Sequence, residues 1–100
     1  MPIALQIVMN GVARSEALEA RIREAAAKLE HRHPRATRCR VAVDEIEKHH
    51  HQGRQFRVKV EVHAPGHEVA VSTLHHHEDV YVALNDAFDS VRRRLEGAEA

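Results

Sequence analysis

The chain has 100 residues, 43% of them hydrophobic, and its 15 basic side chains balance 15 acidic ones, so the formal net charge is zero. This length suits one domain with a modest core, and a single cysteine excludes an internal disulfide, which favours a reducing, cytoplasmic location. No apolar run approaches the roughly 20 residues of a membrane span, and no signal peptide is visible, so we expect no membrane partner.

The hydrophobic pattern predicts four strands and two helices. Alternating apolar residues predict strands over residues 3–9, 38–44, 56–63 and 69–73. The first helix is predicted to begin after Ser15, a good N-cap, and to end before Pro34. The second is predicted from about Asp79 to about Leu95, where apolar residues recur at helical spacing: Val80, Leu84, Phe88, Val91 and Leu95.

This order, β-α-β-β-β-α, predicts an α+β two-layer sandwich with a four-stranded mixed sheet and two helices on one face. Residues 1–95 would form the single domain and residues 96–100 a short flexible tail. The apolar sheet face is expected to consist of Val41, Val43, Phe56, Val58, Val60, Val62, Val69 and Val71. The topology should place His49–His51 and His75–His77 at one end of the domain, and His31, His33, His63 and His67 at the other.

Charge is unevenly distributed along the chain. Residues 14–40 hold eight basic groups and four glutamates, a net of +4, whereas residues 64–91 hold five acidic groups and no Lys or Arg, a net of −5. We expect basic residues from distant segments to converge on a single cationic surface that suits a polyanion. Four basic residues are expected on the sheet face away from the helices: Arg38, Arg40, Arg57 and Lys59. We expect some of these like charges to lie opposite one another, although Asp44 and Glu61 on the same face offset part of the positive charge.

Several short segments resemble the ribosome hibernation-promoting factor and ribosome-associated inhibitor A family. They are Asn10-Gly11-Val12, Ser15-Glu16-Ala17-Leu18, Lys28-Leu29-Glu30, the Val41–Asp44 and Arg57–Val62 strands, and Asp79-x-Tyr81-x-Ala83-Leu84 with Arg93 and Leu95. The resemblance covers almost the whole chain, from Ile3 to Leu95.

The resemblance implies a fold like that of double-stranded-RNA-binding domains and a place on the small ribosomal subunit, in the channel for mRNA and tRNA. Members block translation and preserve idle ribosomes in stationary phase or stress. Carried over to this sequence, the candidate contacts with ribosomal RNA are Arg21, Arg23 and Lys28 on the first helix and Arg92, Arg93 and Arg94 on the second.

The chain also departs from the family pattern. Typical members are clearly basic, and the second helix here has Asn85 and Ser90 where the pattern favours Asp and Lys. Longer members carry a C-terminal extension that they use for ribosome dimerisation, whereas only Glu96–Ala100 follows the second helix here. Three consecutive arginines also suit the negative end of a helix dipole, so a solvated final turn is an alternative interpretation of Arg92–Arg94.

We expect no enzymatic activity, cofactor, small-molecule substrate or physiological metal site. The sequence has no glycine-rich phosphate loop, and Cys39 falls on the inward face of its strand, where a buried apolar role is expected. Adjacent histidines on an extended chain point in opposite directions, which disfavours one shared metal ion. The alternative functions are a divergent member that acts as a protein-interaction or histidine-mediated metal-binding module, or a binder of another structured RNA.

Overall fold

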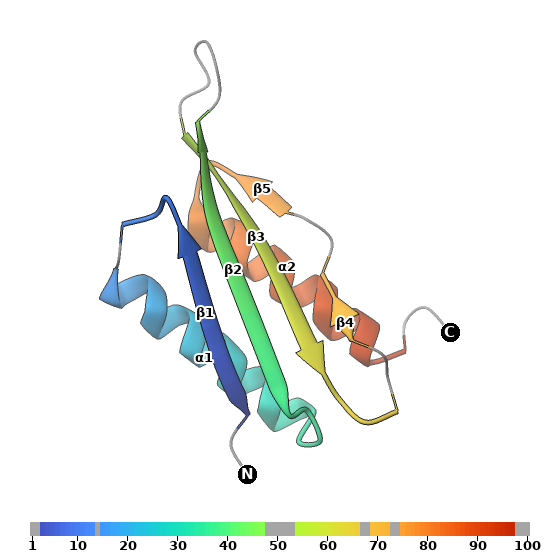
Figure 1. Cartoon of the computed structure of the whole chain (residues 1–100). Coiled ribbons are helices and arrows are strands. Elements are labelled where there is room, and N and C mark those ends of the chain that lie inside the picture. Colours follow the sequence, from blue (N-terminus) through green and yellow to red (C-terminus); the bar gives the residue numbers. More distant parts are fainter. Residues whose placement is uncertain (1–2, 14, 48–53, 67–68, 73–74, 98–100) are drawn as a thin grey trace.

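A computed structural model describes residues 3–13, 15–47, 54–66, 69–72 and 75–97 of the chain. In these residues, five strands and two helices form two layers, with both helices against the same face of the sheet (Figure 1). The elements are β1 (Ala4–Asn10), α1 (Glu16–Arg32), β2 (Arg38–Glu47), β3 (Arg54–His63), β4 (Ala70–Val71), β5 (His75–His77) and α2 (Val80–Leu95). The α+β two-layer architecture is therefore confirmed.

The sheet is mixed, as predicted, but the strand predicted over residues 69–73 is reduced to β4, and β5 is a fifth strand that was not predicted. β1 pairs with β2 in parallel, β2 pairs with β3 antiparallel, and β4 and β5 both pair antiparallel with β3. Between them, Ser72 bonds to β3 through its side chain: its Oγ accepts from Val60 N at 2.9 Å, and its own N–H donates to Val60 O at 2.8 Å. A hydroxyl thus takes the place of a main-chain carbonyl in the ladder just after β4 ends.

The inward residues of this region also differ from the prediction. Val62 lies opposite Ala70 and Glu61 opposite Val71, so Ala70 and Ser72 are buried, whereas Val71 lies on the outer face. Val69 precedes β4 and is 41% exposed. The prediction that Val69 and Val71 face the core was therefore wrong, because the register on β3, rather than side-chain hydrophobicity, decides which alternate residues point inward.

α1 begins at its predicted cap, Ser15, and α2 begins at the predicted position, with Asp79 as its N-cap. Ser15 Oγ accepts a hydrogen bond from Leu18 N at 3.2 Å, and Asp79 Oδ1 accepts one from Tyr81 N at 2.8 Å. These bonds satisfy main-chain N–H groups that have no partner within the helix. Each helix then buries one stripe against the sheet: Leu18, Ile22, Ala26 and Leu29 from α1, and Ala83, Leu84, Ala87, Phe88, Ser90, Val91 and Leu95 from α2.

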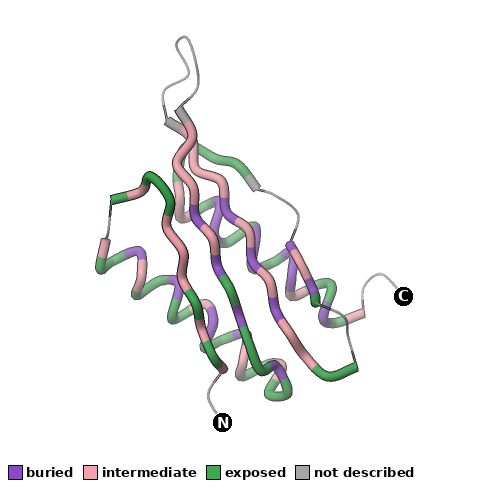
Figure 2. The backbone as a smooth tube through the Cα atoms, viewed as in Figure 1, coloured by how far each residue is buried: buried purple, intermediate pink, exposed green. Residues whose placement is uncertain are grey.

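The core lies between the layers, and buried positions alternate along β2 and β3 (Figure 2). The central strands supply Cys39, Val41, Val43, Val58, Val60 and Val62. Cys39 is buried as predicted, and burial raises the pKa of its thiol to about 12, so the thiolate is suppressed at neutral pH. Burial and the raised pKa both favour the buried apolar role predicted for Cys39 over a nucleophilic one.

The described histidines lie at the ends that topology predicts. His75–His77 pair with Phe56–Val58, close to where β2 and β3 join. His63 lies opposite Arg38 at the other end of the sheet, where His33 caps the C-terminus of α1. His49–His51 and His67 lie outside the described residues.

Candidate nucleic-acid interface

A groove of about 440 Å³ lies between α1 and α2, and we call it the helix groove. Leu29 and Phe88, both buried, and Ala25, half-buried, give it an apolar lining. Its polar lining residues are Arg21, Glu24, Lys28 and Arg32 from α1, and Asn85, Asp89 and Arg92 from α2. Four cationic side chains therefore line the groove against two carboxylates, which leaves a local excess of positive charge in a neutral protein.

Helical spacing explains how these cations gather. Arg21, Lys28 and Arg32 occupy one stripe of α1, because residues seven and four apart lie on the same side of a helix. Arg92 approaches from α2, with which α1 packs. The guanidinium of Arg21 lies 5.3 Å from the centre of the Tyr81 ring, a cation–π distance that ties this end of the stripe to α2. Tyr81 itself packs against the core, at its rim.

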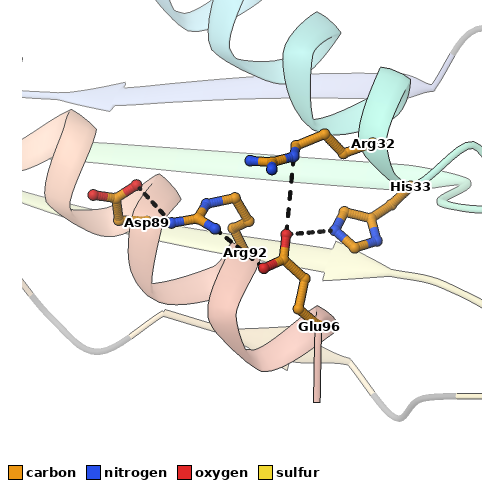
Figure 3. Close-up of polar contacts among 5 residues, drawn as sticks. All are labelled: Arg32, His33, Asp89, Arg92 and Glu96. Carbon is orange, nitrogen blue, oxygen red and sulfur yellow. Dashed lines mark hydrogen bonds and ion pairs between the residues drawn. The ribbon is translucent and has the colours of Figure 1, made fainter. Parts of the chain in front are cut away.

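Glu96, the C-cap of α2, joins the cations at the other end of the groove (Figure 3). Its Oε1 lies 3.1 Å from Arg92 Nη1, and its Oε2 lies 4.0 Å from Arg32 Nε and 3.5 Å from His33 Nε2. Arg92 also lies 3.5 Å from Asp89. Exposed ion pairs of this kind contribute about 0–1 kcal/mol each, so a phosphate group can compete with these carboxylates.

A second group of cations lies on the face of the sheet away from the helices, which we call the outer sheet face. The side chains of Arg38, Arg40, Arg57 and Lys59 lie there, as predicted, because the residues that alternate with them are buried in the core. A hollow of about 260 Å³ lies beside Arg38, Arg40 and His63.

Three of the four cations on the outer sheet face, Arg40, Arg57 and Lys59, are paired with carboxylates, so the expectation of opposed like charges was wrong. The register places Arg57 opposite Asp44 and Arg40 opposite Glu61. Arg57 donates to Asp44 Oδ2 from Nε at 3.3 Å and from Nη2 at 3.1 Å. Arg40 lies 3.7 Å and Lys59 3.6 Å from Glu61. Cross-strand pairing of opposite charges stabilises the sheet.

The ten predicted contact residues do not form one surface, so the single cationic surface expected from the sequence was wrong. The helix residues and the sheet residues lie on opposite faces of the sandwich. Arg21, Lys28 and Arg92 line the helix groove, whereas Arg23, Arg93 and Arg94 are exposed outside it, with Arg23 3.5 Å from Glu19. Among described residues, the predicted contact cations with no ion pair are Lys28, Arg38, Arg93 and Arg94.

Sequence reasoning missed Arg32 as a site residue. Its side chain lines the helix groove beside Lys28 and Arg92. The sequence could have indicated this position. Arg32 follows Lys28 by four residues and Arg21 by eleven, and these spacings place all three on one side of a helix.

Within the described ranges, no group of three or more His, Cys, Asp or Glu residues could hold a metal ion. No described helix has the length and apolar character that crossing a bilayer requires.

Comparison with known proteins identifies the family. The model of the family described as sigma 54 modulation protein / S30EA ribosomal protein matches residues 5–99. The chain belongs to this family. The family comprises ribosome-associated factors rather than enzymes. No curated protein matches the sequence.

Solved structures share the fold at low sequence identity. A ribosomal subunit interface protein from Coxiella burnetii is 18% identical with a TM-score of 0.71, over 97% of this chain and 98% of that chain. The N-terminal domain of Protein Y from Thermus thermophilus is 17% identical with a TM-score of 0.74, over the same shares, 97% and 98%. Nearly the whole of this chain therefore corresponds to nearly the whole of each of those structures.

Proposed function

We propose that this protein is a cytoplasmic translation inhibitor that binds ribosomal RNA in the mRNA and tRNA channel of the small ribosomal subunit and silences ribosomes in stationary phase or stress. Membership of a ribosome-associated family supports a ribosomal partner. The observation that carries the RNA part is the helix groove, where Arg21, Lys28, Arg32 and Arg92 outnumber the carboxylates even when Glu96 at its end is counted with Glu24 and Asp89.

The groove is a better candidate for the main RNA contact than the outer sheet face. On the sheet, Arg40, Arg57 and Lys59 each lie within 4 Å of a carboxylate that also belongs to that face. Lys28 in the groove and Arg38 on the sheet both lack an ion pair among described residues. The groove is favoured because its four cations come from two helices and line a hollow of about 440 Å³, whereas the hollow beside Arg38 and Arg40 is about 260 Å³. With Tyr81, Phe56 and Phe88 as the only aromatic residues, recognition would depend on phosphates and shape rather than on base stacking.

The test is the salt dependence of binding to purified small subunits. Each phosphate contact contributes about 0.7 to 0.9 to the slope of log affinity against log salt. Lys28→Gln with Arg92→Gln should therefore lower the slope by about 1.5 and weaken binding at low salt. Arg23→Gln with Arg93→Gln removes the same charge from outside the groove and is the matched control.

Three other results would contradict this proposal or favour an alternative function. An equal loss for both pairs of substitutions would mean that cations outside the groove contribute as much as those inside it, so the groove would not be the main contact. If neither salt nor either pair of substitutions changes the amount of protein that sediments with ribosomes, the alternative is favoured. The protein would then be a family member that acts as a protein-interaction or metal-binding module. Competition by generic RNA duplex as strong as by small subunits would favour a binder of another structured RNA.

A further inference from the structure

Among the strands that the structure describes, β1 forms one edge of the sheet, and one row of its main-chain groups has no strand partner. Among the described strands it pairs only with β2. Ala4 N donates to Thr37 O at 3.0 Å, so the N–H and C=O of Ala4 point toward β2. Because these directions alternate along a parallel strand, the N–H and C=O groups of Leu5, Ile7 and Met9 point away from the sheet.

This edge lacks the features that usually prevent strands from pairing with other chains. Such features are short strands, charged side chains, proline and bulges. The opposite edge consists of β4 and β5, which are two and three residues long. β1 is seven residues long, and residues 3–12 contain no charged residue and no proline.

The inward side chains of β1 are also incompletely covered. Leu5, Ile7 and Met9 are half-buried, whereas the residues opposite them on β2 are at most 1% exposed: Cys39, Val41 and Val43. A hollow of about 330 Å³ beside the strand is lined by Ile7, Met9, Val12 and Glu19. An additional strand at this edge would cover apolar surface that the chain leaves partly open to water.

We propose that β1 is a self-association surface, on which a second copy of this chain adds its own β1 antiparallel about a two-fold axis at Ile7. This register places Ile7 opposite Ile7 and Leu5 opposite Met9 of the second copy. These are the residues whose main-chain groups face outward, so three pairs would form about six hydrogen bonds, two for each pair. The two sheets would then be continuous across the interface.

The sequence of β1 is complementary to itself in this register. For this reason the proposed partner strand is the β1 of a second copy. The inward face would carry only Leu, Ile and Met side chains, and would extend the apolar layer between sheet and helices from one copy to the next. On the outer face, Gln6 would lie opposite Val8 and Ala4 opposite Asn10. A two-fold axis brings identical groups together, so a charged edge would repel itself, whereas this edge brings no like charges together.

The proposal is independent of the RNA-binding function. No residue of β1 lines the helix groove. Failure of either proposal would therefore leave the other standing.

The first experiment measures the mass of the full chain in solution by sedimentation velocity, from micromolar to near-millimolar concentration. We expect a concentration-dependent dimer. Gln6→Lys with Val8→Lys would bring like charges face to face across the two-fold axis, and should weaken dimerisation at least tenfold. The matched control is Gln55→Lys with Val71→Lys, which adds the same charge to the same sheet face on β3 and β4, away from this edge, and should leave the dimer intact.

The second experiment tests the register without disturbing the inward face. Gln6 and Val8 of the second copy would form a non-hydrogen-bonded pair, in which side chains approach most closely. Mixing Gln6→Cys protein with Val8→Cys protein under mild oxidation should give a cross-linked dimer, and each variant alone should give several-fold less. Cys39 is buried and does not compete.

A protein that stays monomeric at every concentration would overturn the proposal. A dimer that Gln6→Lys with Val8→Lys leaves unchanged, or cross-linking that is no greater in the mixture than in the separate variants, would overturn it equally. Circular dichroism of each variant separates loss of dimer from loss of fold.

Discussion

Arg92 and Glu96 lie one turn apart at the end of α2, with Arg92 Nη1 3.1 Å from Glu96 Oε1. The same carboxylate lies 4.0 Å from Arg32, so it neutralises part of the charge of the two cations at this end of the helix groove. Glu96 is thus an internal competitor for any phosphate that binds there. Removing its charge should change RNA affinity in a predictable direction.

Glu96→Gln should raise affinity for small ribosomal subunits at low salt. The substitution releases Arg92 and Arg32 from an ion pair, and each cation that then gains a phosphate adds about 0.7 to 0.9 to the salt slope. The stability lost should be under about 1 kcal/mol, because the pairs are exposed. The measurement is affinity against salt concentration for the variant and the wild type.

Glu16→Gln is the matched control for this prediction. Glu16 is exposed in the first turn of α1 and does not line the groove, so neutralising it changes the net charge equally without releasing a groove cation. Affinity that rises equally in both variants would mean that only the net charge matters. Affinity that falls in Glu96→Gln would mean that Glu96 positions Arg92 for its contact.

Helices, caps and the core stripes were predictable because their causes are local. The side chains of Ser15 and Asp79 accept hydrogen bonds from main-chain N–H groups only two or three residues further along the chain. The apolar stripe of α2 follows from residue spacing alone. The outward direction of Arg57 and Lys59 was predictable for the same reason, since alternation along β3 decides it.

Relationships that depend on strand register were not predictable. The sequence places Arg57 on the outer face but does not set it opposite Asp44, because that depends on where the paired parts of β2 and β3 begin and end. The same dependence reversed the faces of Ala70 and Val71. The position of Arg32 in the candidate site required knowing that α2 packs beside that stripe of α1.

Ser72→Ala should lower the free energy of unfolding by about 1–3 kcal/mol. The Ser72 hydroxyl is the acceptor for Val60 N at 2.9 Å, and Ser72 is only 5% exposed. Alanine would leave that buried N–H without a partner, and an unsatisfied buried donor costs about this much. Urea unfolding measures the change. Ser72→Thr keeps the hydroxyl and should recover part of the loss; equal losses in the two variants would show that the bond is not the cause.

Cys39 should make the stability of the protein decline at alkaline pH. Burial raises the pKa of its thiol from 9.0 to about 12, so between these values the unfolded thiol has lost its proton while the folded thiol keeps it. The contribution of this difference to stability is therefore fully present below pH 9 and is lost as the pH rises toward 12. Its steepest decline is about 1.4 kcal/mol per pH unit.

Comparison with Cys39→Ala isolates this contribution, because all other titrating groups are common to both proteins. Alanine removes a buried side chain, so the variant should be less stable at neutral pH. The free energies of unfolding of the two proteins should then converge above pH 9, measured by urea unfolding at successive pH values. If the difference between the two free energies of unfolding stays constant above pH 9, the thiol ionises as readily in the folded protein as in the unfolded chain. Burial among valine side chains opposes that outcome, because it disfavours the charged thiolate.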